Sequence, residues 1–537
     1  MKFDFIIIGA GSAGCILADR LSESGKHSVL IIEAGSKDSY PWIKLPVGFG
    51  KTYYNPKYNY MYYTQPEANL ANRKLYAPRG KVQGGSGSIN AMVYVRGQPS
   101  DFDDWAAQSN KGWCYKEVLP FFKKLEQHPA GDTEFHSAQG KIAITPMKHQ
   151  AHPLCKHYLS AAQSIGLPLN EDFNGSQFEG AGIYDINVRQ GQRDSSNTAY
   201  LKPALKRANL TLFRETIAEK IIFENNSACA VQINKAGISQ RISANKEIII
   251  AAGAVDSPKL LQLSGVGDKT TLEKHQIPII QHLPAVGQNL QDHLCVSYYY
   301  KANISTLNDE LGPLLNQIKA GAKYLFNRSG PLSLSVNQAG GFFKGADTEQ
   351  HANIQLYFNP MSYQIPKDPK AQLKPDPYSG FLIAFNSCRP SSKGSVDIAG
   401  PDYRQPPLIK PNYLSTEKDI QEVLQGHRIV QQLMQSDALK AITAEQISPS
   451  TCISDDSAVL QYFRENAGSI YHLCGTCKMG VDASDAVVDN RLRVYGVQNL
   501  RVIDASIFPT ITSANINAPV MMVAEKGAQM ILEDTQT

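Results

Sequence analysis

The stretch FDFIIIGAGSAGCILADRLSESGKHSVLIIE, residues 3–33, decides the fold of this chain. It opens with an apolar run over 3–8 and continues with glycines and small residues over 9–14. Apolar residues then recur at helical spacing over 15–21, and a second apolar run occupies 28–32. This order of strand, glycine-rich turn, helix and strand predicts a βαβ unit whose two strands lie buried in a parallel sheet.

The glycine spacing in this unit is typical of a dinucleotide site. Gly9 permits a tight turn, Gly11 lets the backbone approach a diphosphate, and Gly14 lets helix and strand pack closely. The diphosphate would meet the helix N-terminus, where free N–H groups and the helix dipole favour an anion. Glu33 follows the second strand, where a carboxylate can accept hydrogen bonds from ribose hydroxyls. This unit alone does not distinguish NAD from FAD.

Composition narrows the class of protein. The 537 residues suffice for two or more domains, and 42% hydrophobic and 19% charged residues are typical of a globular protein. A net charge of +4 is too weak to indicate a nucleic-acid partner. No apolar run is long enough to be a transmembrane segment, and the first run is too short for a signal peptide. We therefore expect a cytoplasmic protein, with peripheral contact at the inner face of a membrane left open.

The nine cysteines are an odd number scattered over a long chain, which favours reduced core thiols over a disulfide framework. Cys474-x-x-Cys477 lacks the second pair of ligands that a closed zinc site needs, and Lys478 stands where a c-type haem would require histidine. We therefore predict no metal site. The tyrosines between 53 and 63 form a cluster that we interpret mainly as packing.

The rest of the chain predicts a second architecture. A third buried strand is expected over 247–252, so the nucleotide domain is predicted to be discontinuous. Alternation over 354–358 and 395–398 predicts antiparallel strands with one face covered. The segment 359–380 carries five prolines and several lysines without periodicity, which predicts a long loop. That loop is either a solvated excursion, which we favour, or a lid or weakly basic partner surface.

A second glycine- and serine-rich stretch occupies residues 80–90. Small residues there allow a backbone to lie against a flat or anionic group. The stretch runs directly into the apolar residues 91–95, which are expected to be buried. A loop anchored in this way is better suited to cover a cofactor than to move freely at the surface.

These segments together resemble the glucose-methanol-choline (GMC) family of FAD-dependent oxidoreductases. Residues 80–94 look like its first signature, with a departure at Gln83, where an aliphatic residue is usual. Residues 253–267 match its second signature throughout, and 284–293 are similar to the segment that follows it. The stretch 471–530 completes a resemblance that covers almost the whole chain.

The resemblance implies an α/β fold, α+β overall: a Rossmann-like FAD-binding domain, and a substrate domain with an antiparallel sheet flanked by helices. It also implies non-covalent FAD, because Ile89 stands where members with a flavin-linked histidine carry that histidine. The FAD-binding domain would comprise 1–155, 196–297 and 465–537, and the substrate domain 156–195 and 298–464. The predicted cofactor-binding residues are Gly9, Gly11, Ser12, Ala13, Gly14, Glu33, Ala34, Gly80, Gly84, Gly85, Ser86, Asn90, Ala91, Val93, Ala218, Asp504, Ala505, Asn517 and Pro519.

The catalytic pair is also carried over from the resemblance. Oxidising an alcohol moves a hydride from carbon and a proton from oxygen, and histidine suits the second task since its ordinary pKa is about 6.5. His472 resembles the family's catalytic histidine, although Leu473 stands where proline is common. Asn515 falls where relatives have asparagine or histidine, and its amide could hold the substrate oxygen.

The implied activity is that of an FAD-dependent alcohol dehydrogenase similar to the choline dehydrogenases of this family. Electrons would pass to a quinone, a carrier protein or oxygen, and the last of these would make the enzyme an oxidase. A hydroxynitrile-lyase-like enzyme that keeps FAD without redox use is a further alternative. Around 337–341, where choline-type relatives often show glutamate, this chain has the neutral Gln338, which favours a neutral primary alcohol over choline.

Overall fold

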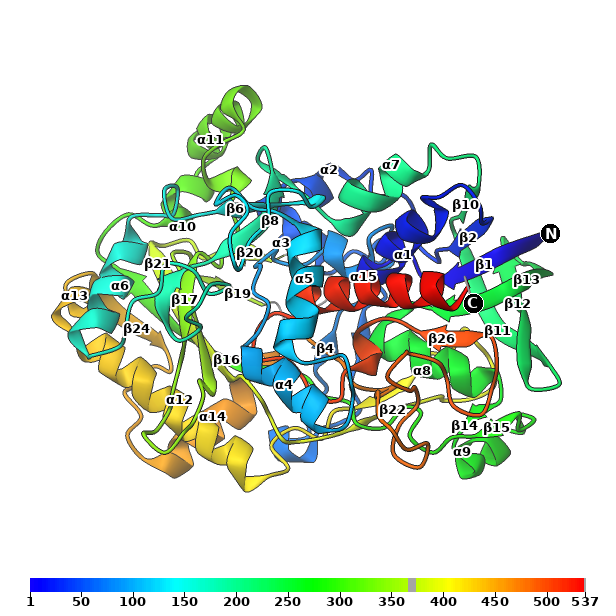
Figure 1. Cartoon of the computed structure of the whole chain (residues 1–537). Helices are drawn as coiled ribbons and strands as arrows, with labels where there is room; N and C mark the ends of the chain where they lie inside the picture. Colours follow the sequence, from blue (N-terminus) through cyan, green and yellow to red (C-terminus); the bar gives the residue numbers. More distant parts are fainter. Residues whose placement is uncertain (366–372, 536–537) are drawn as a thin grey trace.

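The computed structural model describes residues 1–365 and 373–535 of the chain. It is a mixed α/β structure built around two large sheets, which lie at opposite ends of the molecule in Figure 1. The α/β class predicted from the sequence is confirmed.

The first sheet collects strands from three distant parts of the chain. Its order is β10-β2-β1-β13-β12-β11, with β26 paired to β13. The contacts among β10, β2, β1, β13 and β26 are parallel, whereas β12 pairs antiparallel with both β11 and β13. The strands are β1 (Lys2–Ile8), β2 (Val29–Ile32), β10 (Leu210–Phe213), β11 (Thr216–Glu224), β12 (Ser227–Lys235), β13 (Ile238–Ile250) and β26 (Leu500–Val502).

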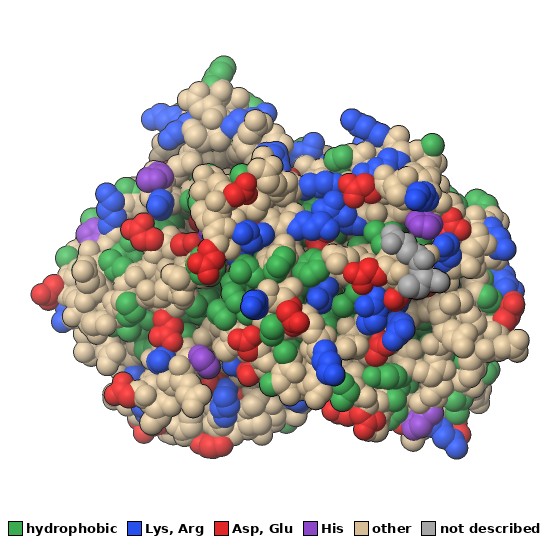
Figure 2. Space-filling model, in the orientation of Figure 1, with side chains coloured by type: hydrophobic (Ala, Val, Ile, Leu, Met, Phe, Trp, Pro, Cys, Tyr) green, Lys and Arg blue, Asp and Glu red, His purple; other side chains and the backbone are tan. Residues whose placement is uncertain are grey.

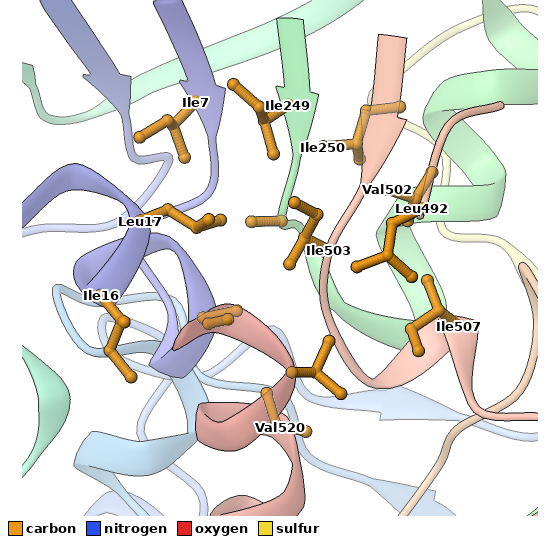
Figure 3. Close-up of a cluster of buried hydrophobic side chains, with 14 of the residues drawn as sticks. Ile7, Ile16, Leu17, Ile249, Ile250, Leu492, Val502, Ile503, Ile507 and Val520 are labelled. Carbon is orange, nitrogen blue, oxygen red and sulfur yellow. The ribbon is translucent and has the colours of Figure 1, made fainter. Parts of the chain in front are cut away.

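The predicted βαβ unit is present, and helices bury one face of its parallel strands. Helix α1 (Ser12–Ser22) follows β1 and packs against α15 (Asn517–Asp534), the last helix of the chain. Figure 3 shows side chains from β1, α1, β13, β26 and α15 meeting in one core. Because α15 lies against α1, the end of the chain reaches the glycine turn at its beginning.

The second sheet is antiparallel throughout, with order β24-β16-β21-β18-β17-β7 and β25 paired to β16. Helices α6 (Leu154–Ser164) and α12 (Glu417–Gln435) pack on it, and α14 (Asp456–Asn466) packs beside α12. The strands are β7 (Gly180–Ile183), β16 (Leu294–Ala302), β17 (Ala339–Phe343), β18 (Ile354–Asn359), β21 (Gly380–Ser387), β24 (Thr443–Ser448) and β25 (Gly468–Ser469).

The expectation of one covered face is wrong for the centre of this sheet. All six residues of β18 are buried. Its alternate side chains Ile354, Leu356 and Phe358 pack with the helices. Tyr357 belongs instead to a separate cluster with Val93 and Ala514. The second face is therefore covered by distant segments of the chain.

Three smaller expectations can be placed on the structure. The strand expected at 395–398 is β22 (Ser395–Asp397), paired antiparallel with β23 (Leu408–Lys410). Part of the predicted 359–380 loop, 366–372, lies outside the described residues, and its flanks pair as β19 (Tyr363–Gln364) and β20 (Lys374–Pro375). All nine cysteines are free, but only six are buried, and Cys452 is exposed.

Gly14 provides a test of the close packing between α1 and β1. A methyl group at Gly14 would lie 1.9 Å from the backbone oxygen of Gly9, so Gly14→Ala must push helix and strand apart. We expect it to lower the free energy of unfolding by about 1–3 kcal/mol or more. Chemical unfolding followed by tryptophan fluorescence measures this loss.

Gly321→Ala is the matched control. Gly321 lies in α11 (Leu314–Asn327), and a methyl group there meets no atom within 4 Å. Because alanine favours helix over glycine, this variant should gain about 0.5–1 kcal/mol. A Gly14→Ala protein as stable as the wild type would contradict the packing argument.

Candidate active site

The glycine turn presents uncapped backbone N–H groups at the start of α1. The residue before the helix is Gly11, whose lack of a side chain leaves the first N–H groups without a side-chain cap. No acidic residue lies in the first turn of this helix. The positive end of the helix dipole therefore faces the turn unopposed, as an anion-binding site requires.

The second glycine-rich stretch lies directly on this turn. The backbone N–H of Gly84 donates to the carbonyl of Ala10 at 2.7 Å. A methyl group at Gly85 would lie 2.7 Å from the Cα of Gly11, so two backbones touch where side chains would separate them. The two stretches that the sequence predicts to share a cofactor are thus brought together.

Glu33 braces the same turn from the end of β2. Its carboxylate accepts hydrogen bonds from the backbone N–H of Ala10 at 2.9 Å and of Gly35 at 2.7 Å. Burial raises the pKa of this carboxyl to about 7, against the lowering effect of those two N–H donors. Each carboxylate oxygen keeps a further lone pair, which a ribose hydroxyl could use.

The residues around this turn fit FAD. Buried oxygens of Ser36 and Ser196, and both amide atoms of Asn197, have no hydrogen-bond partner within residues 1–365 and 373–535. Asn197 lies beside Gly84, where a methyl group would be 3.2 Å from its Cβ. Buried polar atoms without partners are costly, so a polar ligand that satisfies them is expected here. A helix N-terminus, two glycine segments and a carboxylate match the diphosphate and ribose of a dinucleotide.

Other predicted cofactor residues reach the same region from separate elements. Asn517, at the start of α15, accepts from the Ser12 hydroxyl at 2.7 Å. The Asn90 amide oxygen accepts from the Arg193 guanidinium at 2.6 Å. Asp504 accepts from the backbone N–H of Gly253 at 2.8 Å and so contacts the start of α8 (Gly253–Leu263), just after β13.

Ala218 lies on a strand that is tied to the end of β2. It is on β11, whose first residue, Thr216, donates its N–H to the Glu33 carbonyl at 3.0 Å. This contact ties β11 to the end of β2, two residues before Ala218.

His472 and Asn515, predicted as the catalytic pair, are adjacent. The Nδ2 of Asn515 lies 3.2 Å from the Nε2 of His472. Protein atoms surround His472 on most sides, yet it keeps some accessible surface. The amide oxygen of Asn515 is buried without a hydrogen-bond partner in the described part of the chain.

A chain of hydrogen bonds fixes which nitrogen of His472 carries the proton. The Nε2 of His293 lies 2.8 Å from the Cys388 carbonyl oxygen, which can only accept, so that Nε2 must carry a proton. In neutral His293 the Nδ1 is then an acceptor, and it receives the Nδ1–H of His472 at 2.8 Å. The Nε2 of His472 is therefore an unprotonated lone pair, and it accepts from the Asn515 amide.

Burial keeps both imidazoles neutral. It lowers the pKa of His293 to about 4. It also lowers the pKa of His472 well below the ordinary value, and His293 and the Arg79 guanidinium lower it further. The hydrogen-bond chain therefore holds over the neutral pH range.

The backbone on both sides of this pair is held in place by buried polar groups. Asp292 accepts from the backbone N–H of His472 at 2.7 Å and from the Tyr413 hydroxyl at 2.5 Å. Tyr471 has a φ of 72°, which is strained for a tyrosine, and Arg79 donates to its carbonyl at 2.6 Å.

The loop that carries Asn515 is anchored two residues earlier. The backbone N–H and hydroxyl of Ser513 donate to the buried carboxylate of Asp101 at 2.8 and 2.6 Å. Gln98 donates to the same hydroxyl at 2.8 Å. These contacts fix the position from which Asn515 faces His472.

The inner face of the second sheet forms a wall beside Asn515. Tyr357 of β18 packs in one cluster with Ala514, the neighbour of Asn515, and its hydroxyl is buried without a hydrogen-bond partner in the part of the chain that the structure describes. Gln355 precedes it on the same face, and both atoms of its amide also lack partners there. Cys295 of β16 belongs to this wall as well. These groups are neutral, so this wall offers hydrogen bonds and apolar contact without a fixed charge.

The contacts of Gln338 give no evidence for the neutral substrate that its sequence position suggests. Its amide oxygen accepts from the backbone N–H of His152 at 2.7 Å, just before α6, and contacts the Cys155 thiol. Gln338 therefore stabilises the segment just before α6 through these contacts.

Sequence reasoning missed His293, Asp292 and Tyr357 as site residues. The first two lie in the segment 284–293, which resembles the family pattern but carries no side-chain signal of a role.

Cys474 and Cys477 are buried, and burial raises the pKa of each thiol well above its usual range. Both are therefore inert thiols, as the core interpretation predicts.

Known proteins resemble the chain along its whole length. The GMC oxidoreductase N-terminal model matches residues 3–295 and the C-terminal model matches 390–524. An oxygen-dependent choline dehydrogenase from Photobacterium profundum is 39% identical over 99% of this chain and 93% of its own length. The mitochondrial choline dehydrogenase of Homo sapiens is 38% identical, over 99% of this chain and 90% of its own. Pyridoxine 4-oxidase from Mesorbium loti has a similar structure, with a TM-score of 0.88, 30% identity and 98% coverage of both chains.

The neutral state of His293 predicts a pH dependence of stability. With a pKa of about 4 in the folded protein and about 6.5 when unfolded, His293 takes up its proton more readily in the unfolded state. Its contribution to stability is therefore lost as pH falls below 6.5, by about 2 kcal/mol between pH 7 and pH 5. His293→Gln keeps a donor for Cys388 and an acceptor for His472 but cannot titrate.

The measurement compares chemical unfolding of the wild type and His293→Gln at pH 7 and pH 5. The wild type should lose about 2 kcal/mol more than the variant over this range. His149→Gln, at an exposed histidine, should lose as much as the wild type. Equal losses in the wild type and His293→Gln would show that His293 is not held neutral.

Proposed function

The chain belongs to the GMC oxidoreductase family, and on this premise we propose that it oxidises a primary alcohol to an aldehyde with His472 as the base. Its relatives support flavin-dependent alcohol oxidation of the choline dehydrogenase type. The observation that carries the assignment of the base is the unprotonated Nε2 of His472, which lies beside the amide of Asn515.

His472 and Asn515 would have different roles at the hydroxyl group of the substrate. An alcohol oxygen between them would accept from the Nδ2–H of Asn515 and donate its proton to Nε2 of His472. The amide thereby holds the oxygen, and so the carbon that bears it, in one place. As the proton arrives on Nε2, the Nδ1–H of His472 remains bound to His293, which keeps the ring in position.

FAD would supply the hydride acceptor at flavin N5 when bound, and we propose that it is held without a covalent bond. Ile89 offers no nucleophilic atom for a flavin linkage. We also propose that the residues predicted from the glycine segments, Glu33 and the start of α15 hold the cofactor, and that the chain divides into the two domains given above. The partnerless Ser36, Ser196 and Asn197 support this placement.

A neutral primary alcohol suits the wall beside Asn515 best. The wall beside Asn515 presents Cys295, Gln355 and Tyr357 and no carboxylate from β16 or β18. Choline is the second candidate, since two of the relatives named above are choline dehydrogenases and aromatic side chains can hold a quaternary ammonium group. Anaerobic flavin bleaching by straight-chain primary alcohols and by choline separates the two.

We propose that a quinone, a carrier protein or oxygen takes the electrons, and that the protein works in the cytoplasm. Hydrogen peroxide formed under air, with and without an artificial acceptor, distinguishes an oxidase from a dehydrogenase. In the part of the chain that the structure describes, no helix is both long enough and apolar enough to cross a bilayer.

Replacing the base tests the central assignment. His472→Ala should still bind FAD, and acid precipitation should release the flavin into the supernatant. Bleaching of the flavin by substrate without oxygen should slow by about 10²–10⁴-fold, because no group receives the hydroxyl proton. Stopped-flow absorbance of the flavin measures the rate.

Cys474→Ser is the control, at a buried thiol two residues away, and should bleach at nearly the wild-type rate. Wild-type bleaching in His472→Ala would overturn the assignment. A flavin that stays oxidised in the wild type while substrate is consumed would instead indicate a lyase.

A further inference from the structure

Helix α11 exposes a continuous apolar surface. It spans Leu314–Asn327 and projects from the body of the molecule at the top of Figure 1. Of the 14 exposed large apolar side chains in the described residues, five lie on this one helix. Their exposed fractions are 72% for Leu314, 73% for Leu315, 60% for Ile318, 70% for Leu325 and 86% for Phe326.

These five side chains share one face of the helix. At about 100° per residue they fall within about 120° of its circumference, together with Ala322. The helix contacts the protein through a different face, on which Ala320 and Tyr324 are buried four residues apart. The apolar stripe of this amphipathic helix therefore points to solvent, the reverse of what a helix on a soluble core shows.

Positive charge lies next to the stripe. Lys319 and Lys323 follow it on the helix surface, and Arg328 caps the C-terminal end over the ring of Tyr324. Neither lysine forms an ion pair within 1–365 and 373–535, and no aspartate or glutamate occurs from 313 to 330. Figure 2 shows this projection with blue cationic side chains and a green apolar tip. A surface that combines exposed apolar side chains with unpaired cations is typical of proteins that bind anionic phospholipid.

We propose that α11 is an interfacial membrane helix, which inserts Leu314, Ile318, Leu325 and their neighbours among the lipids of an anionic bilayer. A folded protein partner would complement one fixed shape, whereas five projecting aliphatic and aromatic side chains beside lysines suit a fluid surface of acyl chains and phosphates. The helix would lie in the plane of the interface, with its lysines at the level of the headgroups.

The position of α11 links the bilayer to the candidate active site. The chain continues from α11 through a short helical turn, Pro331–Ser333, to Ser335, whose hydroxyl donates to the carbonyl of Ala91 at 2.8 Å. Ala91 follows the second glycine stretch. Membrane docking through α11 would therefore hold the redox site close to the lipid, where apolar alcohols and quinones are concentrated. The docking surface itself does not depend on the proposed activity.

Vesicle flotation of the purified holoprotein tests the proposal. The wild type should float with phosphatidylglycerol-rich vesicles and much less with pure phosphatidylcholine. The double variant Leu325→Ser/Phe326→Ser should bind both at least about tenfold more weakly, because its apolar contact is lost. Lys319→Gln/Lys323→Gln should lose binding to the anionic vesicles only, and added salt should mimic this loss.

Ile238→Ser is the matched control, since Ile238 is also 70% exposed but lies on β13, and it should float like the wild type. Flavin absorbance and activity with a soluble acceptor should be unchanged in every variant, which separates docking from folding and from catalysis. A wild type that fails to float, or a Leu325→Ser/Phe326→Ser protein that floats equally well, overturns the proposal. The proposal is also overturned if the wild type does not bind vesicles but forms a dimer in sedimentation velocity, and the Leu325→Ser/Phe326→Ser variant is a monomer.

Discussion

The close packing at Gly14 is the constraint on which the rest depends, because any side chain there would overlap the carbonyl oxygen of Gly9. It lets α1 start directly on the end of β1, with its first N–H groups uncovered. The other segments proposed to hold the cofactor then converge on that short turn: Gly84 and Gly85 from one loop, Glu33 from the end of β2, and Asn517 from the far end of the chain. A bulkier helix start would displace all of them together.

The candidate site is assembled between two sheets of different kinds. The parallel sheet holds the cofactor turn at its strand ends, whereas the antiparallel sheet supplies a flat neutral wall. His472 and Asn515 arrive between them on irregular segments of the C-terminal stretch, which buried carboxylates hold rigid. Binding of the cofactor and recognition of the alcohol can thus vary independently, since they rest on separate scaffolds.

The sequence predicted what depends on local pattern and missed what depends on distant contacts. The βαβ unit over 3–33 follows from spacing alone, and the small residues over 80–90 predict a loop that covers a cofactor. The inner face of β18 was expected to face solvent, because its covering residues Val93 and Ala514 are far away in the chain. His293 was passed over because its role rests on the backbone carbonyl of Cys388, which no side-chain pattern reveals.

The hydrogen-bond chain behind His472 has a consequence for proton conduction. It ends at the carbonyl oxygen of Cys388, a group that accepts a hydrogen bond but cannot pass a proton onward. A proton taken up by His472 can move at most to His293 and then has no exit into the interior. The hydrogen-bond chain therefore cannot conduct a proton into the interior. If His472 is the base, as we propose, its proton must therefore leave again from Nε2, on the side where the alcohol would bind.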